Sequence, residues 1–222
     1  MTFDIALVAG ARPNFVKIAP ILRALEVNSA VSDQVRCRLI HTGQHYDHGM
    51  SQAFFDDLGI RQPDTNLGCG SGSQAEVTGN IMVAFERELV EHPADLVLVV
   101  GDVNSTLACS VVAKKMCCML AHVEAGIRSG DMSMPEEINR IVTDSLSDIF
   151  YTPSESANQN LRRVGVPEEK IVFVGNVMMD SLVGNVERLR QPAVWKEAAL
   201  EEGRYLVLTM HRPATVDDPA RV

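Results

Sequence analysis

The chain has 222 residues, of which 46% are hydrophobic and 22% charged, and its formal net charge is −9. This length can hold one large domain, or one domain and part of another. The acidic balance argues against nucleic-acid binding, which needs a basic face. No apolar run has the length of a transmembrane helix or the flanks of a signal peptide. Five cysteines without Cys-x-x-Cys spacing favour reduced thiols, so we expect a cytoplasmic α/β protein that binds neither nucleic acid nor membrane.

Strand-like apolar runs alternate with helical patterns along most of the chain, which is typical of βαβ units and a parallel sheet. The predicted strands are residues 3–9, 35–42, 95–100, 117–123, 149–151 and 171–174. The predicted helices are residues 13–27, 50–58, 73–91, 104–116 and 135–146, followed by one that Ser154 caps. The run 95–100 is apolar throughout, as expected of a strand covered on both faces. We therefore predict a Rossmann-like parallel sheet in a domain of residues 1–176.

The last part of the chain, residues 177–222, follows a different pattern. Two helical patterns meet at Gln191 and Pro192, and a lone apolar strand is predicted at residues 205–209. A single strand with a helix just beginning behind it cannot form a core of its own. We expect this part to be inter-domain helices and the first strand of a truncated second domain.

Polar residues follow several of the predicted strands. They include Arg12, Gln44, His45, Asp102, Glu124, His211 and Arg212. In an open parallel sheet, ligands bind beyond the carboxyl ends of the strands, near the point where the strand order reverses. Two carboxylates, several histidines and two arginines at one edge predict a functional site there.

The first turn of the helix at 13–27 could bind an anion. Pro13 fixes this turn, so backbone N–H groups point towards the strand end. Lys17 lies one turn later and Arg12 just before, which suits a diphosphate. Only one glycine is present, so this is neither a Walker loop nor a Gly-x-Gly-x-x-Gly fingerprint. An ordinary turn with two solvated cations fits the spacing equally well.

Asp102 and Glu124 each follow an apolar strand, which can leave a carboxylate partly desolvated and its pKa adjustable. Asp102 could instead cap the helix that follows it, whereas no predicted helix begins at Glu124. Glu136 and Glu137 form an acidic pair at a helix start, where the macrodipole alone accounts for them.

A metal site is the less favoured interpretation of the histidines. His41, His45, His48 and His122 accompany Asp47 and Glu124, but without a diagnostic ligand spacing. Near the ends of buried strands, a hydrogen-bonded structural histidine is commoner than a ligand. The glycine-rich stretch 68–72 is expected to be a plain connection, because no predicted strand immediately precedes it.

Six stretches carry a family resemblance. They are Gly10-Ala11-Arg12-Pro13 with Lys17, Thr42-Gly43-Gln44-His45-Tyr46-Asp47, Gly101-Asp102-Val103-Asn104-Ser105-Thr106, His122-Val123-Glu124-Ala125-Gly126-Ile127-Arg128, Pro135-Glu136-Glu137-Ile138-Asn139-Arg140 and His211-Arg212-Pro213. In this order they resemble the non-hydrolysing UDP-N-acetylglucosamine (UDP-GlcNAc) 2-epimerases.

The resemblance implies one half of a glycosyltransferase-B-like architecture, in which two Rossmann-like domains enclose a cleft. It also implies that the protein forms a homodimer. It implies interconversion of UDP-GlcNAc and UDP-N-acetylmannosamine (UDP-ManNAc) for cell-envelope polysaccharides, with no cofactor and no metal. By position, the catalytic residues are Asp102, Glu124, Glu136 and His211. The substrate-binding residues are Arg12, Lys17, Gln44, His45, Arg128 and Arg212. For Glu136 this overrides the macrodipole interpretation.

The family's reaction accounts for these residue types. The proton at C2 of the sugar is not adjacent to a carbonyl, so the family eliminates UDP to give a glycal and then adds UDP back. An acid/base group is needed on each face of C2, and carboxylates can serve. Cations and donors, for which Arg12, Lys17 and His211 are candidates, stabilise the departing diphosphate.

Two departures from the family pattern limit what the resemblance implies. Tyr46 and Asp47 stand where members activated by their own substrate carry other residues, so we expect no such regulation. The same motif occurs in relatives that act on diacetamido-uronic acid sugars, which leaves the sugar open. The family's uracil- and ribose-binding loops lie beyond Val222, so we expect little affinity or turnover from this chain alone. A hydrolysing relative that releases free ManNAc and a non-catalytic dimerisation or regulatory module are the alternatives.

Overall fold

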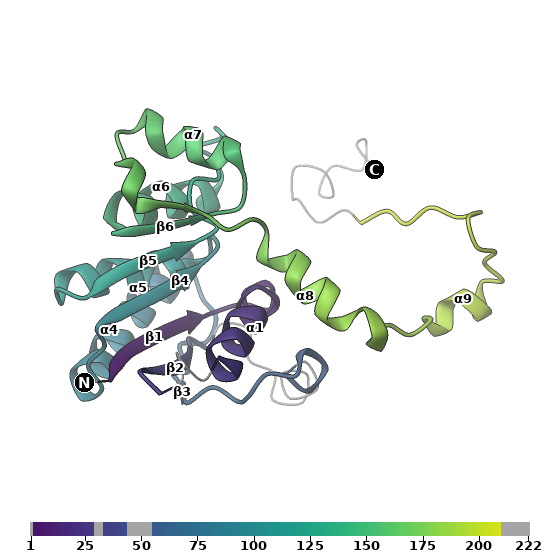
Figure 1. Cartoon of the computed structure of the whole chain (residues 1–222), viewed down its shortest axis with the longest axis horizontal. Coiled ribbons are helices and arrows are strands. Elements are labelled where there is room, and N and C mark those ends of the chain that lie inside the picture. The colour runs from purple at the N-terminus through teal and green to yellow at the C-terminus, as the bar shows by residue number, and fades with distance from the viewer. Residues whose placement is uncertain (1, 29–32, 44–54, 210–222) are drawn as a thin grey trace. The chain divides into compact units, whose positions relative to one another are not determined.

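The computed structural model describes residues 2–28, 33–43 and 55–209, with only the backbone described for Arg12 (Figure 1). Within these ranges a sheet of seven strands has the order β3-β2-β1-β4-β5-β6-β7, and every neighbouring pair is parallel. The strands are β1 (Phe3–Ala9), β2 (Val35–His41), β3 (Thr65–Asn66), β4 (Leu96–Val100), β5 (Met119–Val123), β6 (Ile149–Thr152) and β7 (Ile171–Phe173). The predicted Rossmann-like parallel sheet is confirmed.

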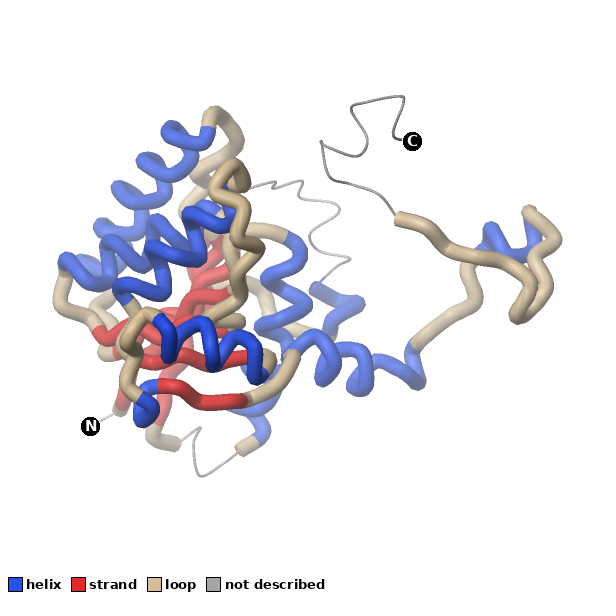
Figure 2. The backbone as a smooth tube through the Cα atoms, turned by 90° about the horizontal axis from the view of Figure 1, so that it is seen from above, coloured by secondary structure: helices blue, strands red, loops and turns tan. Residues whose placement is uncertain are grey.

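Helices cover both faces of this sheet (Figure 2). They are α1 (Arg12–Val27), α4 (Gln74–Glu91), α5 (Asn104–Lys115), α6 (Pro135–Leu146), α7 (Glu155–Arg163) and α8 (Val177–Asn185). The side chains of β4 alternate between two cores. Leu98 packs with the α1 side chains, whereas Val97 and Val99 pack with those of α4 and α5. Strand β4 is therefore covered on both faces, as its composition predicts.

The strand order reverses between β1 and β4. From β1 the chain adds β2 and β3 on one side, and from β4 it adds β5, β6 and β7 on the other. The carboxyl ends of β1 and β4 therefore flank the crevice where ligands bind in doubly wound sheets.

One predicted strand begins later than expected. The strand predicted at residues 117–123 starts at Met119. The Cys117 N–H donates to the Lys114 carbonyl and the Cys118 N–H to the Ala113 carbonyl, at 3.2 and 2.9 Å. These bonds close the end of α5 in a Schellman motif, with Cys117 at φ 61°. The adjacent cysteines belong to this turn and not to the strand.

Two short segments also differ from expectation. Residues 205–209 form no strand, and Leu206, Val207 and Leu208 are 99%, 83% and 78% exposed. Because no other described strand pairs with them, their backbone has no ladder to join. Conversely, β3 stands just before the glycine-rich stretch and pairs with the end of β2, so the reason for treating that stretch as a plain connection is wrong. Of the helix predicted at 50–58, residues 55–58 are helical and the rest lie outside the described residues.

The chain divides into two compact units, residues 1–185 and 186–222. Helix α8 belongs to the first unit, where it packs on α1 and the Ser181 hydroxyl donates to the Val16 carbonyl. In the second unit, α9 (Ala193–Glu197) carries Trp195, whose ring packs edge-on against that of Tyr205, with the ring centroids 5.9 Å apart. Among the described residues, no helix combines the length and apolar character needed to cross a membrane.

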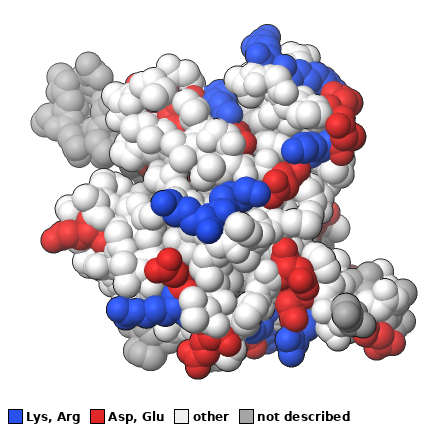
Figure 3. All heavy atoms as spheres, turned by 90° about the vertical axis from the view of Figure 1, so that its left-hand side faces the viewer, with Lys and Arg blue, Asp and Glu red and all other residues white. Residues whose placement is uncertain are grey.

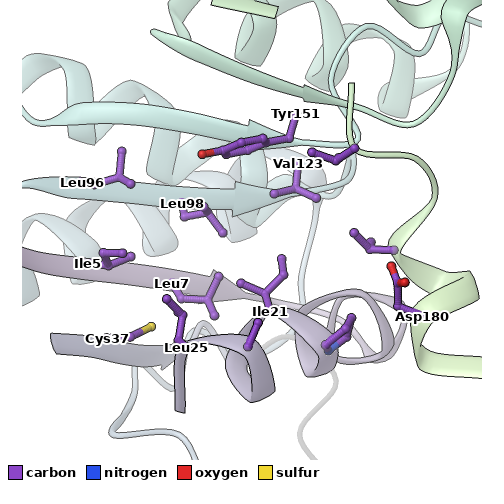
Figure 4. Close-up of a pocket in the computed structure, with 14 residues that line it drawn as sticks. Ile5, Leu7, Ile21, Leu25, Cys37, Leu96, Leu98, Val123, Tyr151 and Asp180 are labelled. Carbon is purple, nitrogen blue, oxygen red and sulfur yellow. The ribbon is translucent and has the colours of Figure 1, made fainter. Parts of the chain in front are cut away.

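An apolar groove of about 550 Å³ lies between α1 and the face of β4, β5 and β6 that α1 does not cover (Figure 4). Leu98, Val123 and Tyr151 line it from the sheet, and Ile21 and Leu25 line it from α1. The groove opens to solvent at its rim, while Leu98 and Val123 from the sheet are only 7% and 3% exposed.

Acidic and basic side chains lie interspersed on the face where β1 begins (Figure 3). Two of their ion pairs are Arg36 with Asp4 at 2.5 Å and Lys114 with Asp148 at 2.7 Å. Pairs of this kind keep the amino ends of the strands free of a large field of one sign.

Candidate functional site

Asn14 holds the turn between β1 and α1. Its Oδ1 atom accepts the N–H groups of Gly10 and Ala11, at 3.1 and 2.9 Å, and its Nδ2 donates to the Val100 carbonyl at 3.1 Å. The turn is thereby tied to the end of β4. The same bonds occupy two N–H groups that the sequence would offer to an anion.

Gly10 permits the close approach of this turn to α5. A Cβ atom on Gly10 would lie 1.9 Å from Oγ of Ser105 and 3.0 Å from Oγ1 of Thr42. Real Cβ atoms do not come so close, so a side chain at position 10 would push the strand end away from α5.

Lys17 and Glu124 form an ion pair in the crevice. The Lys17 Nζ lies 2.5 Å from Oε2 of Glu124, and each side chain is 12% exposed. Lys17 reaches across from α1, whereas Glu124 follows β5 with its backbone at φ 70°. Gly101 lies beside the pair, since a Cβ there would be 3.1 Å from the Lys17 Nζ and 3.6 Å from Oε2 of Glu124. Two residues predicted from separate motifs are thus brought together.

Asp102 is held by α6. The Arg140 Nη2 pairs with its carboxylate, and Nδ2 of Asn139 donates to its carbonyl at 2.8 Å. Helix α5 has Val103 as its N-cap, without a capping side chain, so Asp102 does not have the capping role that its position allowed. The Asp102 carboxylate is instead oriented by a cation at the edge of the crevice.

The acidic pair at the start of α6 divides into an accessible and a buried carboxylate. Glu136 is exposed, whereas Glu137 is only 1% exposed. Glu137 accepts the N–H groups of Ser129 and Gly130 at 2.9 and 3.0 Å, and Nη1 of Arg140 at 3.0 Å. Burial raises the pKa of Glu137, but these bonds outweigh it and lower the pKa to about 2. Glu137 therefore anchors the loop before α6, and Glu136 is the member open to solvent.

Two histidines at strand ends are structural, as the sequence analysis expects. His122 is fully buried, with its ring nitrogens 2.7 Å from Oδ1 of Asp144 and 2.8 Å from the Gly101 carbonyl. The His41 ring stacks on that of Phe15, with the ring centroids 5.1 Å apart, and its Nδ1 accepts the Gly43 N–H. Burial lowers the pKa of His41 to about 4, so this ring is neutral at pH 7.

Arg128, predicted to bind substrate, pairs with the same carboxylate as His122. Its Nη1 lies 2.6 Å from Oδ2 of Asp144. Burial raises the pKa of Asp144, yet the bond from His122 and the charges of His122 and Arg128 outweigh it and hold the pKa below its usual range. The Arg128 guanidinium is thereby fixed beside the turn that carries Glu124.

Some predicted site residues fall outside the description. Gln44, His45, His211 and Arg212 lie in the ranges that the structure does not describe, and Arg12 is seen only as the first backbone residue of α1. In the described ranges, no three His, Cys, Asp or Glu side chains are grouped to hold a metal ion.

The partners of these carboxylates were not predicted. Asn14, Arg140 and Asp144 each fix a site residue or its turn, but none directly follows a strand. Two of them had a visible signal: Asn14 directly follows Pro13 in the first turn of the predicted helix, and Arg140 lies one helical turn beyond Glu136. Nothing local marks Asp144, whose contacts are with distant residues.

Comparison with known proteins identifies the family. The family model described as UDP-N-acetylglucosamine 2-epimerase matches residues 29–222, which is most of the chain. The chain belongs to the UDP-N-acetylglucosamine 2-epimerase family. The resemblance drawn from the six motifs is thus confirmed, and these enzymes are isomerases of nucleotide sugars.

Members of this family from several organisms are similar to the chain. The UDP-N-acetylglucosamine 2-epimerase of Methanocaldococcus jannaschii is 38% identical over 221 residues, which cover 98% of this chain and 59% of the relative. The UDP-2,3-diacetamido-2,3-dideoxy-D-glucuronate 2-epimerase of Pseudomonas aeruginosa is 40% identical over 220 residues, covering 98% and 60%. The chain therefore spans about three fifths of the length of these 2-epimerases.

A solved structure of one of these relatives has the same fold as this chain. The crystal structure of the M. jannaschii UDP-GlcNAc 2-epimerase in complex with UDP-GlcNAc and UDP has a TM-score of 0.86 and 38% identity to the chain. The match covers 97% of this chain and 59% of the other. The described sheet and helices are thus those of a 2-epimerase over the part that the two chains share.

Proposed function

We propose that the protein to which this chain belongs interconverts UDP-GlcNAc and UDP-ManNAc. The observation that carries the proposal is the placement of Asp102 and Glu124. They follow neighbouring parallel strands beside the strand-order reversal, and each carboxylate is paired with a cation from a different helix. Membership of the 2-epimerase family supports the same conclusion.

The proposed reaction is an elimination followed by an addition. A base takes the proton from C2, the C2–H electron pair forms a C1=C2 double bond, and the C1–O bond to UDP breaks. A second group then protonates C2 from the opposite face, and the UDP oxygen bonds again to C1. Because the sugar ends at the oxidation level at which it began, no redox cofactor is required, and we propose that no metal is needed.

The proposed acid/base groups are Asp102, Glu124 and Glu136, and His211 is proposed as a further catalytic residue. The pairing of Glu124 with Lys17 supports a role as base, because the ion pair fixes the direction of the carboxylate in the crevice. Glu136 is exposed and therefore open to a ligand. Substrate binding is assigned to Arg12, Lys17, Gln44, His45, Arg128 and Arg212.

The setting of this activity is part of the proposal. We assign the enzyme to the cytoplasm, to the supply of nucleotide sugars for cell-envelope polysaccharides, and to a homodimer of the glycosyltransferase-B-like architecture. The chain spans about three fifths of its relatives. We propose that most of the nucleotide-binding surface lies in the part of the relatives that these 222 residues do not match.

A modified sugar is the second candidate substrate. It is favoured by the similarity to the P. aeruginosa relative, which is named for a diacetamido-glucuronate and is 40% identical to the chain. The two candidates share the chemistry at C1 and C2 and differ in the substituents at C3 and C6.

The proposal is tested by hydrogen exchange at C2. The 222-residue chain and a version continued at its carboxyl end to the full length of its relatives are each incubated with UDP-GlcNAc in deuterated water. We expect deuterium at C2, and UDP-ManNAc, with the extended version only. In that version Glu124→Gln should slow the exchange by about 100-fold or more, as expected for loss of a general acid or base.

The other outcomes are informative. Exchange with only the diacetamido-glucuronate nucleotide would select the second candidate, and release of free ManNAc would indicate a hydrolysing enzyme. If the extended version folds and exchanges neither nucleotide sugar, the epimerase proposal fails, and a non-catalytic module becomes the better interpretation.

A further inference from the structure

His122 links two strand ends to helix α6. Its ring lies in β5 and is fully buried. On one side Nε2 meets the carbonyl of Gly101, the residue just before Asp102, at 2.8 Å. On the other side Nδ1 meets Oδ1 of Asp144 in α6 at 2.7 Å. Both ring nitrogens therefore face oxygen atoms.

The partners define where the hydrogens of this ring lie. A carbonyl oxygen only accepts, so Nε2 must donate to Gly101. Oδ2 of Asp144 accepts the Gly126 N–H at 3.1 Å and faces Nη1 of Arg128 at 2.6 Å. A protonated Asp144 would leave the Arg128 guanidinium against a neutral acid. An ionised Asp144 satisfies both cations, and Nδ1 then donates as well.

Among the described residues, Asp144 has the one charged side chain that pairs with this ring. Lys17 and Glu124, which pair with each other, lie beside Gly101. The described residues thus form a row of imidazole, carboxylate and guanidinium, in which the imidazole and the carboxylate are buried.

The Asp144 carboxylate also fixes the turn that carries Glu124. This turn has two residues with left-handed backbone, Glu124 at φ 70° and Gly126 at φ 80°. Asp144 holds the Gly126 N–H, and Nδ2 of Asn160 donates to the Gly126 carbonyl at 3.0 Å. Such a backbone persists only where its surroundings hold it.

We propose that the buried His122–Asp144 pair is a positioning unit for Glu124 and Asp102, in which His122 is an imidazolium that donates from both ring nitrogens. Its carboxylate fixes the turn of Glu124, and its imidazolium fixes the carbonyl before Asp102. Neither residue needs to touch substrate. The positioning role rests on the proposed function of these carboxylates, whereas the protonation of the ring does not.

The protonation is tested by nuclear magnetic resonance on the 222-residue chain itself at pH 7. Long-range ¹H–¹⁵N spectra of the imidazole rings report whether each nitrogen carries a hydrogen, and the signal that His122→Gln removes identifies the ring. We expect hydrogens on both nitrogens of His122, protected from exchange with water. The exposed His92 provides a solvent-accessible reference. A bare Nδ1 on His122 would overturn the proposal.

A pair of variants separates this unit from a general effect of losing a carboxylate that holds a backbone N–H. Asp144 and Asp148 each accept one backbone N–H. Asp148 pairs with Lys114 and its side chain is 31% exposed, whereas Asp144 faces both His122 and Arg128 and is 3% exposed. Asp144→Asn should remove the imidazolium pattern of His122 and speed amide exchange at Gly126. Asp148→Asn should change neither. Equal effects of the two variants, or none from Asp144→Asn, would contradict the assignment.

The positioning role is tested in the extended version, where the C2 exchange can be measured. Asp144→Asn is expected to lower kcat by about 10- to 100-fold, the cost of displacing a reacting group by roughly 1 Å, while KM stays near its original value. Asp148→Asn is the control variant, and it is expected to leave kcat unchanged. An unchanged kcat in a folded Asp144→Asn enzyme would disprove positioning. Absence of exchange in the unsubstituted extended version would instead count against the proposed function, with the ring protonation unaffected.

Discussion

Glu136 and Glu137 show how one peptide bond separates two uses of the same functional group. Glu137 points inward and is surrounded by donors from Ser129, Gly130 and Arg140. Glu136 points to solvent. The inward carboxylate gives up any contact with a ligand and in return holds the loop before α6, which leaves its neighbour available.

The Glu137 carboxylate makes stability depend on pH. Glu137→Gln is expected to lower the free energy of unfolding at pH 7 by about 1–3 kcal/mol, because one backbone N–H and Arg140 lose a charged acceptor. The pKa is about 2 in the folded chain against 4.5 for the free side chain. A depressed pKa stabilises the fold above pH 4.5, and this stabilisation is lost as the pH falls towards 2.

Urea denaturation at pH 7 and at pH 3.5 measures this effect. The difference in the free energy of unfolding between the original chain and Glu137→Gln should be smaller at pH 3.5 than at pH 7. The exposed neighbour provides the control, since Glu136→Gln should leave stability within about 0.5 kcal/mol. A constant difference at both pH values would show that the charge of Glu137 is not the cause.

At the scale of residues, the sequence predicts which side chains meet but not how they pair. Asp102, Glu124 and Lys17 were expected at one edge because strand ends and a helix start converge there, and the described structure brings Lys17 and Glu124 into contact. The bond from Arg140 to Asp102 depends on how α6 crosses the sheet edge. That crossing is set by packing between distant segments, which local patterns do not encode.

At the scale of elements, the end of α5 holds a side chain in a backbone conformation suited to glycine. Cys117 occupies the left-handed position of the Schellman motif at φ 61° and is exposed. A Cβ in this region costs about 1 kcal/mol, and nothing in the described surroundings compensates through burial. The end of α5 is therefore less stable than it would be with glycine at position 117.

Replacing Cys117 should stabilise the chain. Cys117→Gly is expected to raise the free energy of unfolding by about 0.5–1 kcal/mol, because glycine adopts this backbone without strain. Urea denaturation checks the value. Cys117→Ala removes the sulfur but keeps the Cβ, so it should change little. An equal gain from both variants would assign the effect to the thiol and not to the backbone.

Among the elements, those with a long apolar run or a clear start signal could be predicted from the sequence. Strand β4 and helix α6 begin and end within a residue of their predicted limits, because five or more apolar residues or a clear proline start define them. Strand β3 has two residues and exists only because β2 lies beside it. Residues 205–209 have the composition of a strand without a partner among the described residues. Partners, and not composition, decide such short segments.

At the scale of the whole molecule, the net charge of −9 opposes the binding of an anionic nucleotide sugar. A local arrangement of cations must therefore offset it. In the described structure Lys17, Arg128 and Arg140 all lie at the carboxyl end of the sheet, and each is already paired with a carboxylate. Binding of a diphosphate would thus have to compete with these pairs or use other cations.

The groove beside α1 bears on how this chain melts. Leu98 and Val123 in its lining are buried, whereas Val174, which is 46% exposed, and the exposed residues 206–208 are hydrated in the folded state. Unfolding therefore exposes less new apolar surface than in a fully packed protein. Average behaviour for 222 residues predicts a heat-capacity increase of about 3 kcal/mol/K on unfolding. Scanning calorimetry should give a smaller value, and one at or above the average would contradict this account. A smaller heat-capacity change flattens the curve of stability against temperature, so heating and cooling away from the optimum would both weaken this chain gradually.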